Sequence, residues 1–143
     1  MYLQLISHAV MVAAAADRVW AKLIDWQTWP TWDAGMKRVQ FDGPLAVGKV
    51  GRLRLKGSIA AVNLHVLSLD EGHSYTDYFD MLGTRFIFYH SLDTLPNGET
   101  KVLFVVEAKG LTALIMGNIM RGGLAEHLPI WMDNFRRLCE RES

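Results

Sequence analysis

The spacing of hydrophobic and polar positions changes along the chain, and each change indicates a different kind of element. Residues 2–12 are extended in character and predict a strand. Residues 15–25 predict a short amphipathic helix, because their apolar side chains share one helical face: Val19, Trp20, Leu23 and Ile24. Residues 26–35 are rich in tryptophan and contain Pro30. Because the residue before a proline avoids helical geometry, we expect short helical turns around a corner there.

The segment from 37 to 109 alternates between apolar and polar positions and predicts about six strands. Leu53 and Leu55 face one way between basic residues, and Phe86, Phe88 and His90 share a face later in the chain. Gly- and Pro-containing turn signals separate the runs. One apolar face and one wetter face is typical of an antiparallel sheet that is covered on one side.

Residues 111–141 return to helical spacing and predict a long C-terminal helix. Two apolar stripes follow this spacing, one of Leu111, Leu114, Ile115, Asn118 and Ile119 and one of Leu124, Leu128, Trp131, Phe135 and Leu138. Gly122–Gly123 lies between them and Pro129 follows, so a kinked or two-part helix is expected.

These elements predict an α+β fold in one domain, residues 1–143, with the order β-α-α-β6-α. A curved antiparallel sheet of about seven strands must bury its apolar face. The C-terminal helix is the element long enough to cover it.

Composition narrows the classes of function. Fifteen basic residues balance fifteen acidic ones, so we expect no nucleic-acid partner. Without a signal-peptide pattern or an apolar run of membrane-spanning length, we expect no stable membrane insertion. Cys139 is the single cysteine, which suits a cytoplasmic protein. The sequence leaves a homodimer open.

Five local features stand out along the chain. They are Ala16-Asp17-Arg18-Val19-Trp20 leading to Leu23 and Asp25, Trp29-Pro30-x-Trp32-Asp33, Asp42-Gly43-Pro44-Leu45 to Gly48, His90, and Gly110-Leu111. Together with the order of elements, these features resemble the helix-grip (START-like, SRPBCC) superfamily. The closest resemblance is to its bacterial polyketide cyclase/dehydrase and lipid-transport group, and it spans the chain.

The resemblance implies a helix-grip fold with an apolar pocket between the sheet and the C-terminal helix. Together with the strand alternation, it gives a set of expected ligand-binding residues: Trp32, Leu53, Leu55, His65, Tyr78, Phe86, Phe88, His90, Phe104, Met116, Met120 and Leu124. His65 lies in a strand whose two faces are both nearly apolar, so the face that it occupies stays open.

His90 is the main candidate for chemistry, with Tyr78 as a second. An imidazole in an apolar cavity can hydrogen-bond a ligand or transfer a proton near neutral pH. A histidine satisfied by a backbone group is the simpler interpretation, and we favour it over catalysis. Tyr78 and Asp80 share a strand face, as do Tyr75 and Asp77, but both pairs are interpreted as the charged outer face of a strand.

The spacing of the five histidines does not match a metal site, so no metal is expected. The sequence also contains neither a phosphate-binding loop nor a dinucleotide fingerprint, and no cofactor is expected. The favoured function is binding or transport of a hydrophobic small molecule: a lipid, an isoprenoid or an aromatic polyketide-like compound. The alternatives are a cofactor-independent cyclase or dehydratase that uses His90 as acid/base, and a protein-interaction module. The sequence leans against an enzyme.

Overall fold

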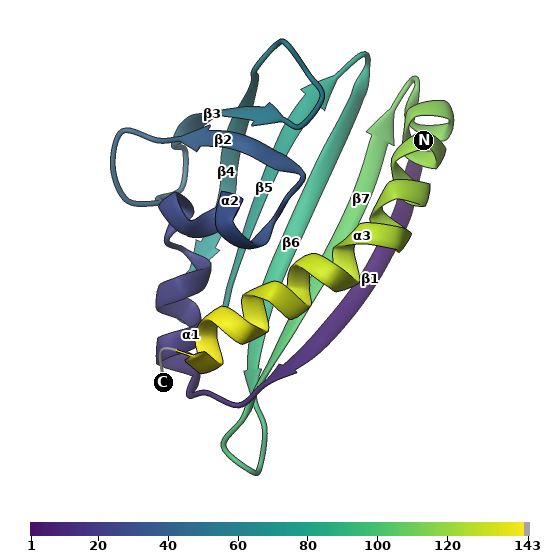
Figure 1. The fold of residues 1–143 in the computed structure, drawn as a ribbon. Helices are drawn as coiled ribbons and strands as arrows, with labels where there is room; N and C mark the ends of the chain where they lie inside the picture. Colours follow the sequence, from purple (N-terminus) through teal and green to yellow (C-terminus); the bar gives the residue numbers. More distant parts are fainter. Residues whose placement is uncertain (142–143) are drawn as a thin grey trace.

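The computed structural model describes residues 1–141, in which a seven-stranded antiparallel sheet curls around one long helix (Figure 1). The order across the sheet is β1-β7-β6-β5-β4-β3-β2, so β1 and β2 form its two edges. The strands are β1 (Tyr2–Val12), β2 (Met36–Gln40), β3 (Val50–Leu55), β4 (Val62–Asp70), β5 (Ser74–Met81), β6 (Thr84–Thr94) and β7 (Thr100–Gly110).

Short helical elements join β1 to β2, and one long helix follows β7. They are α1 (Ala16–Leu23), the 3₁₀ turn η1 (Trp26–Thr28), α2 (Trp29–Trp32) and α3 (Ala113–Arg141). Figure 1 shows α3 lying across the inner side of the curled sheet, with α1 and α2 beside its C-terminal half. The predicted fold class, an antiparallel sheet wrapped around a C-terminal helix, is confirmed. Of the predicted domain, residues 142–143 lie outside the described residues.

The predicted boundaries differ from the structure by a few residues. The helix expected over 15–25 is shorter, and the segment 26–35 contains only single turns around Pro30. The strand region begins at Met36 and ends at Gly110 rather than spanning 37–109. Gly110 has a φ of 124°, so the chain turns there and the helix begins at Ala113 instead of 111.

The helix α3 is continuous from Ala113 to Arg141, with Pro129 inside it. The expected two-part helix therefore does not occur, and a local kink stays a prediction. The apolar members of the first predicted stripe do not pack on the sheet, because all four are exposed: Leu111, Leu114, Ile115 and Ile119. Smaller residues, Ala113 and Gly117, face the sheet in this half, and the second stripe supplies buried Leu124, Leu128 and Phe135.

Gly117 allows α3 to approach the sheet closely. A Cβ atom at this position would lie 3.1 Å from Leu5 Cδ2 and 3.4 Å from the Cβ of Ala108. Both contacts belong to the inner face of the sheet, on β1 and β7. The narrow gap at Gly117 means that free space under the helix lies elsewhere along it.

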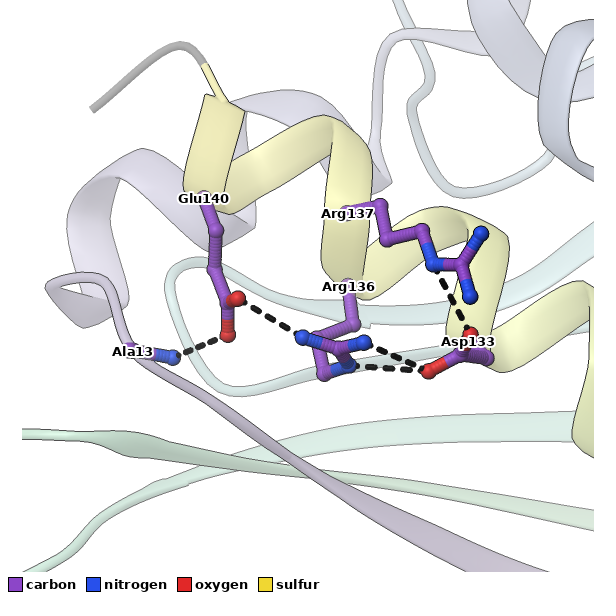
Figure 2. A network of polar contacts seen from close by, with 5 residues as sticks. All are labelled: Ala13, Asp133, Arg136, Arg137 and Glu140. Atoms are coloured by element: carbon purple, nitrogen blue, oxygen red, sulfur yellow. Dashed lines mark hydrogen bonds and ion pairs between the residues drawn. The ribbon is translucent and has the colours of Figure 1, made fainter.

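Polar contacts fix the C-terminal end of α3 (Figure 2). Arg136 binds Asp133 and Glu140 along the helix, and Arg137 Nε lies 3.1 Å from Asp133. The backbone N–H of Ala13 donates a 2.8 Å hydrogen bond to the Glu140 carboxylate. The segment between β1 and α1 is thereby tied to the last turns of the helix.

The turn between β5 and β6 contains an unusual backbone position. Leu82 has a φ of 51° and Gly83 a φ of 85°, and Met81 pairs with Thr84. Two successive positive φ values are typical of a type I′ hairpin turn. Leucine rarely adopts this conformation, and its side chain is exposed here.

Candidate functional site

A cavity of about 300 Å³ lies between the inner face of the sheet and α3. Its lining is mainly apolar and comes from α2, α3, the first residue of β2 and the strands β3 to β7. The apolar side chains include Leu53, Leu55, Leu64, Phe79, Phe88, Phe104, Met120, Leu124, Leu128 and Trp131. Ile119, Gly123 and His127 of α3 also line it and are exposed, so this part of the helix forms the rim.

Eight of the twelve expected ligand-binding residues line this cavity. They are Trp32, Leu53, Leu55, Phe88, His90, Phe104, Met120 and Leu124. The strand alternation was the signal that found most of them. That they contact a ligand stays a prediction.

The other four expected residues do not line the cavity. Phe86 is fully buried against Phe79, and Met116 is half-buried in the core. His65 and Tyr78 pair across β4 and β5 on the outer face of the sheet, where their rings stack with centroids 4.7 Å apart. The Arg85 guanidinium lies 4.1 Å from the Tyr78 ring centroid. His65 and Tyr78 are therefore removed from the candidate site.

The inner face of β5 carries polar groups that were assigned to the outer face. Tyr75 and Asp77 are only 2% and 4% exposed, and both line the cavity. The alternation of apolar and polar residues along β5 could have shown that Tyr75 and Asp77 face inward. Phe79 continues the Tyr75–Asp77 face, whereas the alternate positions, Thr76 and Asp80 among them, are polar.

Asp77 is a buried carboxyl group without a charged partner. Burial raises its pKa from 3.8 to about 8, and only a hydrogen bond from its own backbone opposes this effect. The group is therefore mostly protonated at neutral pH and can donate a hydrogen bond. Ionisation inside the apolar cavity would require a cation beside it.

Asp33 lies at the end of α2 and also lines the cavity. Its Oδ1 accepts a 2.9 Å hydrogen bond from the Gly35 backbone N–H. Burial raises its pKa to about 6, against the opposing effect of backbone N–H groups at Gly35 and Met36. Asp33 is therefore mostly ionised at neutral pH, in contrast to Asp77.

His90 is held in one orientation by Tyr75 of the neighbouring strand. Its Nδ1 lies 3.1 Å from the Tyr75 carbonyl oxygen, and the two rings stack with centroids 4.1 Å apart. Because a carbonyl only accepts hydrogen bonds, Nδ1 carries the proton. Burial lowers the pKa of His90 to about 4. At neutral pH the ring is therefore uncharged, and Nε2 is a hydrogen-bond acceptor rather than an acid.

The tryptophans differ in whether the indole N–H has a hydrogen-bond partner. The indole N–H of Trp29 donates to the Leu23 carbonyl at 2.8 Å, and that of Trp20 donates to Glu71 at 2.9 Å. The buried Nε1 of Trp32, in contrast, has no hydrogen-bond partner. The Trp32 ring packs against Phe104 and Phe135 beside the cavity.

The arrangement is suited to binding an apolar molecule and orienting it through a few polar groups. Within residues 1–141, no cluster of three or more His, Cys, Asp or Glu side chains could hold a metal ion. In the same residues no helix has the length and hydropathy needed to cross a membrane.

Solved structures share this fold at low sequence identity. Norcoclaurine synthase from Thalictrum flavum, in complex with dopamine and hydroxybenzaldehyde, has a TM-score of 0.73 at 16% identity, covering 100% of this chain and 89% of that one. A START superfamily protein from Mycobacterium smegmatis has a TM-score of 0.75 at 16% identity, covering 96% and 98%. A conserved protein from Geobacillus kaustophilus has a TM-score of 0.71 at 16% identity, covering 94% of both chains.

These likenesses confirm the helix-grip fold. Among curated proteins no sequence relative matches. The sequence model for the family described as polyketide cyclase / dehydrase and lipid transport matches residues 4–140, nearly the whole chain. The resemblance stated from the sequence is thereby confirmed, and the chain belongs to this family.

Proposed function

We propose that this protein binds a hydrophobic small molecule in the cavity between the sheet and α3. The observation that carries the proposal is the cavity itself, with its mainly apolar lining and a few convergent polar groups. Small-molecule sites have this composition in general. The fold and the family fit such a role.

The volume limits the size of the ligand. At about 300 Å³, the cavity is near the lower end of the range of ligand pockets. An apolar cavity of ~150 Å³ holds benzene. A fused aromatic ring with a short side chain is a suitable ligand, whereas a two-chain lipid is too large for a cavity of this volume. Dopamine and hydroxybenzaldehyde, which norcoclaurine synthase binds, are also small aromatic compounds with short substituents. This similarity supports a small aromatic ligand here.

The binding test uses an apolar fluorophore and naphthylethanol as a competitor. We expect the folded protein to bind the fluorophore saturably, with about one site per chain, and naphthylethanol to displace it. Met120→Trp fills the cavity and should abolish binding. Met116→Trp, on the same helix but outside the cavity, should retain it. Absence of binding by the folded wild-type protein would refute the proposal, as would equal binding by the two variants.

A cyclase or dehydratase activity is the second candidate, and one specific observation favours it. Asp77 is a mostly protonated carboxyl group at neutral pH. His90 lies in the same cavity as an uncharged ring whose Nε2 can accept a proton. A pair of groups with pKa values moved apart is typical of acid–base sites. Asp77 thus takes the role of acid that the sequence analysis gave to His90. Turnover of a hydroxy-ketone that is abolished in Asp77→Asn and His90→Ala, with the fold retained, supports this activity, and unchanged turnover removes these residues from it.

We also propose a cytoplasmic location and no nucleic-acid partner. The lone, buried Cys139 suits a reducing compartment, and the balanced charge provides no field for nucleic acid. A homodimer is a further proposal, and sedimentation at several protein concentrations tests it.

A further inference from the structure

The described lining of the cavity contains carboxyl groups but no strongly basic side chain. In the described lining, Asp33 and Asp77 supply two carboxyls, and the other titratable groups are Tyr75, Tyr89, His90 and His127. Lysine and arginine do not contribute to the lining. The cavity therefore disfavours anionic ligands, since a ligand carboxylate would meet carboxyl groups and lack a counter-charge.

Basic side chains of the strands occupy the opposite face of the sheet. Arg85 binds Asp80 and covers Tyr78 there, and Arg52 binds the exposed Asn63. These groups are already paired outside, so they do not neutralise the inner carboxyls. A cation beside Asp77 has to come from the ligand.

The aromatic walls favour the same kind of ligand. Trp29, Trp32, Tyr75, Phe104 and Trp131 all line the cavity. The faces of aromatic rings carry partial negative charge and attract cations, most strongly where water is excluded. An apolar body with a protonated nitrogen satisfies both the walls and the carboxyls.

We propose that the ligand is a hydrophobic amine whose ammonium group pairs with Asp77. This inference rests on the proposed function and assigns the chemical class of the ligand of that site. No covalent bond changes. As the ammonium enters, the Asp77 carboxyl loses its proton to solvent and an ion pair forms. The affinity for an amine therefore rises with pH as Asp77 ionises, and one proton is released for each amine bound near neutral pH.

Other groups around Asp77 must be considered in this pH dependence. Asp33 at the end of α2 has a pKa of about 6, Tyr75 of β5 has a pKa raised well above 10, and His90 of β6 has a pKa of about 4. His127 of α3 is exposed at the rim, and Tyr89 of β6 also lines the cavity and is exposed. The strands β3, β4 and β7 contribute apolar side chains such as Leu53, Leu64 and Phe104. A His127→Asn variant checks that the rim imidazole is not the source of the effect.

The test compares three probes with the same apolar body by isothermal titration calorimetry: naphthylethylamine, naphthylethanol and naphthylpropionate. Near pH ~9 we expect the amine to bind about tenfold more tightly than the alcohol, and the carboxylate to bind more weakly than the alcohol. The affinity for the amine should rise about tenfold from pH ~7 to ~9, because the ionised fraction of a group with a pKa of about 8 rises by that factor. A neutral ligand that accepts a hydrogen bond from protonated Asp77 would bind more weakly as the pH rises.

Asp77→Asn should remove both the preference for the amine and its pH dependence while retaining the affinity for the alcohol. Asp80→Asn changes a residue on the same strand but on the outer face. This variant should retain the preference for the amine, its pH dependence and the affinity for the alcohol. Proton release by the wild-type protein at pH ~7, measured in two buffers of different ionisation enthalpy, needs no variant and should be near one for the amine and near zero for the alcohol. Equal binding of amine and alcohol, or no proton release, overturns the inference, whereas failure of all three probes to bind refutes the proposed function itself.

Discussion

Asp77 and His90 show how burial can shift the charge of a side chain against an opposing backbone hydrogen bond. Asp77 has a pKa of about 8 and His90 a pKa of about 4, and desolvation is the largest cause in both. Both groups are therefore mostly uncharged at neutral pH, so neither adds a charge to this mainly apolar part of the cavity. The same effect gives the site an acid and a base in fixed positions.

The effect of Asp77 on stability can be measured. In the unfolded chain its carboxyl ionises near 3.8 and in the folded chain near 8, so between these values the folded state holds a proton that the unfolded state has released. The free energy of unfolding therefore falls as the pH rises through this window. Asp33 also lowers the free energy of unfolding as the pH rises, up to a pH of about 6. His90 has the opposite effect between pH values of about 4 and 6.5, where the unfolded chain holds the proton that the folded chain lacks.

From pH 6.5 to 8 only the contribution of Asp77 remains among these three groups. We expect the wild-type protein to lose about 2 kcal/mol of stability across this interval and Asp77→Asn to lose little. Urea unfolding at both pH values measures the difference. An equal loss in the two proteins would contradict a raised pKa at Asp77.

His90 should be visible by NMR as the neutral tautomer with the proton on Nδ1. The Tyr75 carbonyl holds that proton, and burial keeps the ring uncharged down to a pH of about 4. Nitrogen-15 shifts of the ring, followed from neutral pH downward, check both points. A ring that titrates near 6.5, or that carries its proton on Nε2, would contradict this assignment.

At the scale of residues, strand alternation predicted that His90, Phe88 and Phe104 line the cavity. The prediction succeeded because the two strands that carry them, β6 and β7, each have an unambiguous apolar face. It left the face of His65 open and misplaced Tyr78, Tyr75 and Asp77. The phase of β4 is ambiguous by sequence, and a charged residue within β5 is ordinarily taken as exposed. Asp33 was missed because it follows a helical turn, where no periodicity applies.

The helix α3 owes its place to a small residue that the pattern of large apolar residues did not reveal. Gly117→Leu should destabilise the fold by about 2 kcal/mol, since the side chain would push the helix away from Leu5 and Ala108. Gly122→Leu is the matched control, because a Cβ there meets nothing within 4 Å. Thermal unfolding compares them, and equal effects of the two substitutions would show that the close approach at Gly117 is unimportant.

The turn after β5 offers a stabilising change. Leu82→Asn should raise stability by about 1 kcal/mol, because asparagine tolerates positive φ better than leucine and an exposed apolar side chain is removed. Differential scanning calorimetry measures the shift in Tm. A lowered Tm would mean that Leu82 makes a stabilising contact in solution.

At the scale of elements, the order and the approximate bounds were predictable because each element has a clear period. The exposed stripe of Leu114, Ile115 and Ile119 was not, since helical spacing shows that residues share a face but not which way that face points. The unbroken helix through Pro129 likewise depends on packing that a local rule does not contain.

The whole molecule turns one curled sheet and one helix into a container. The sequence predicted this arrangement, because an apolar sheet face needs a cover. It did not predict the volume, which depends on how closely α3 approaches the sheet. The contact at Gly117 closes one part of the interface and leaves about 300 Å³ farther along the helix.

The measurement that tests the central claim most directly is an isotope-filtered NOE experiment on the protein with bound naphthylethanol. We expect NOEs from the naphthyl ring to the methyl groups of Leu64, Leu124 and Leu128, which line the cavity, and none to Leu67 on the outer face of the sheet. NOEs confined to the exposed Leu114 and Ile115 of α3 would place the ligand outside and contradict the account.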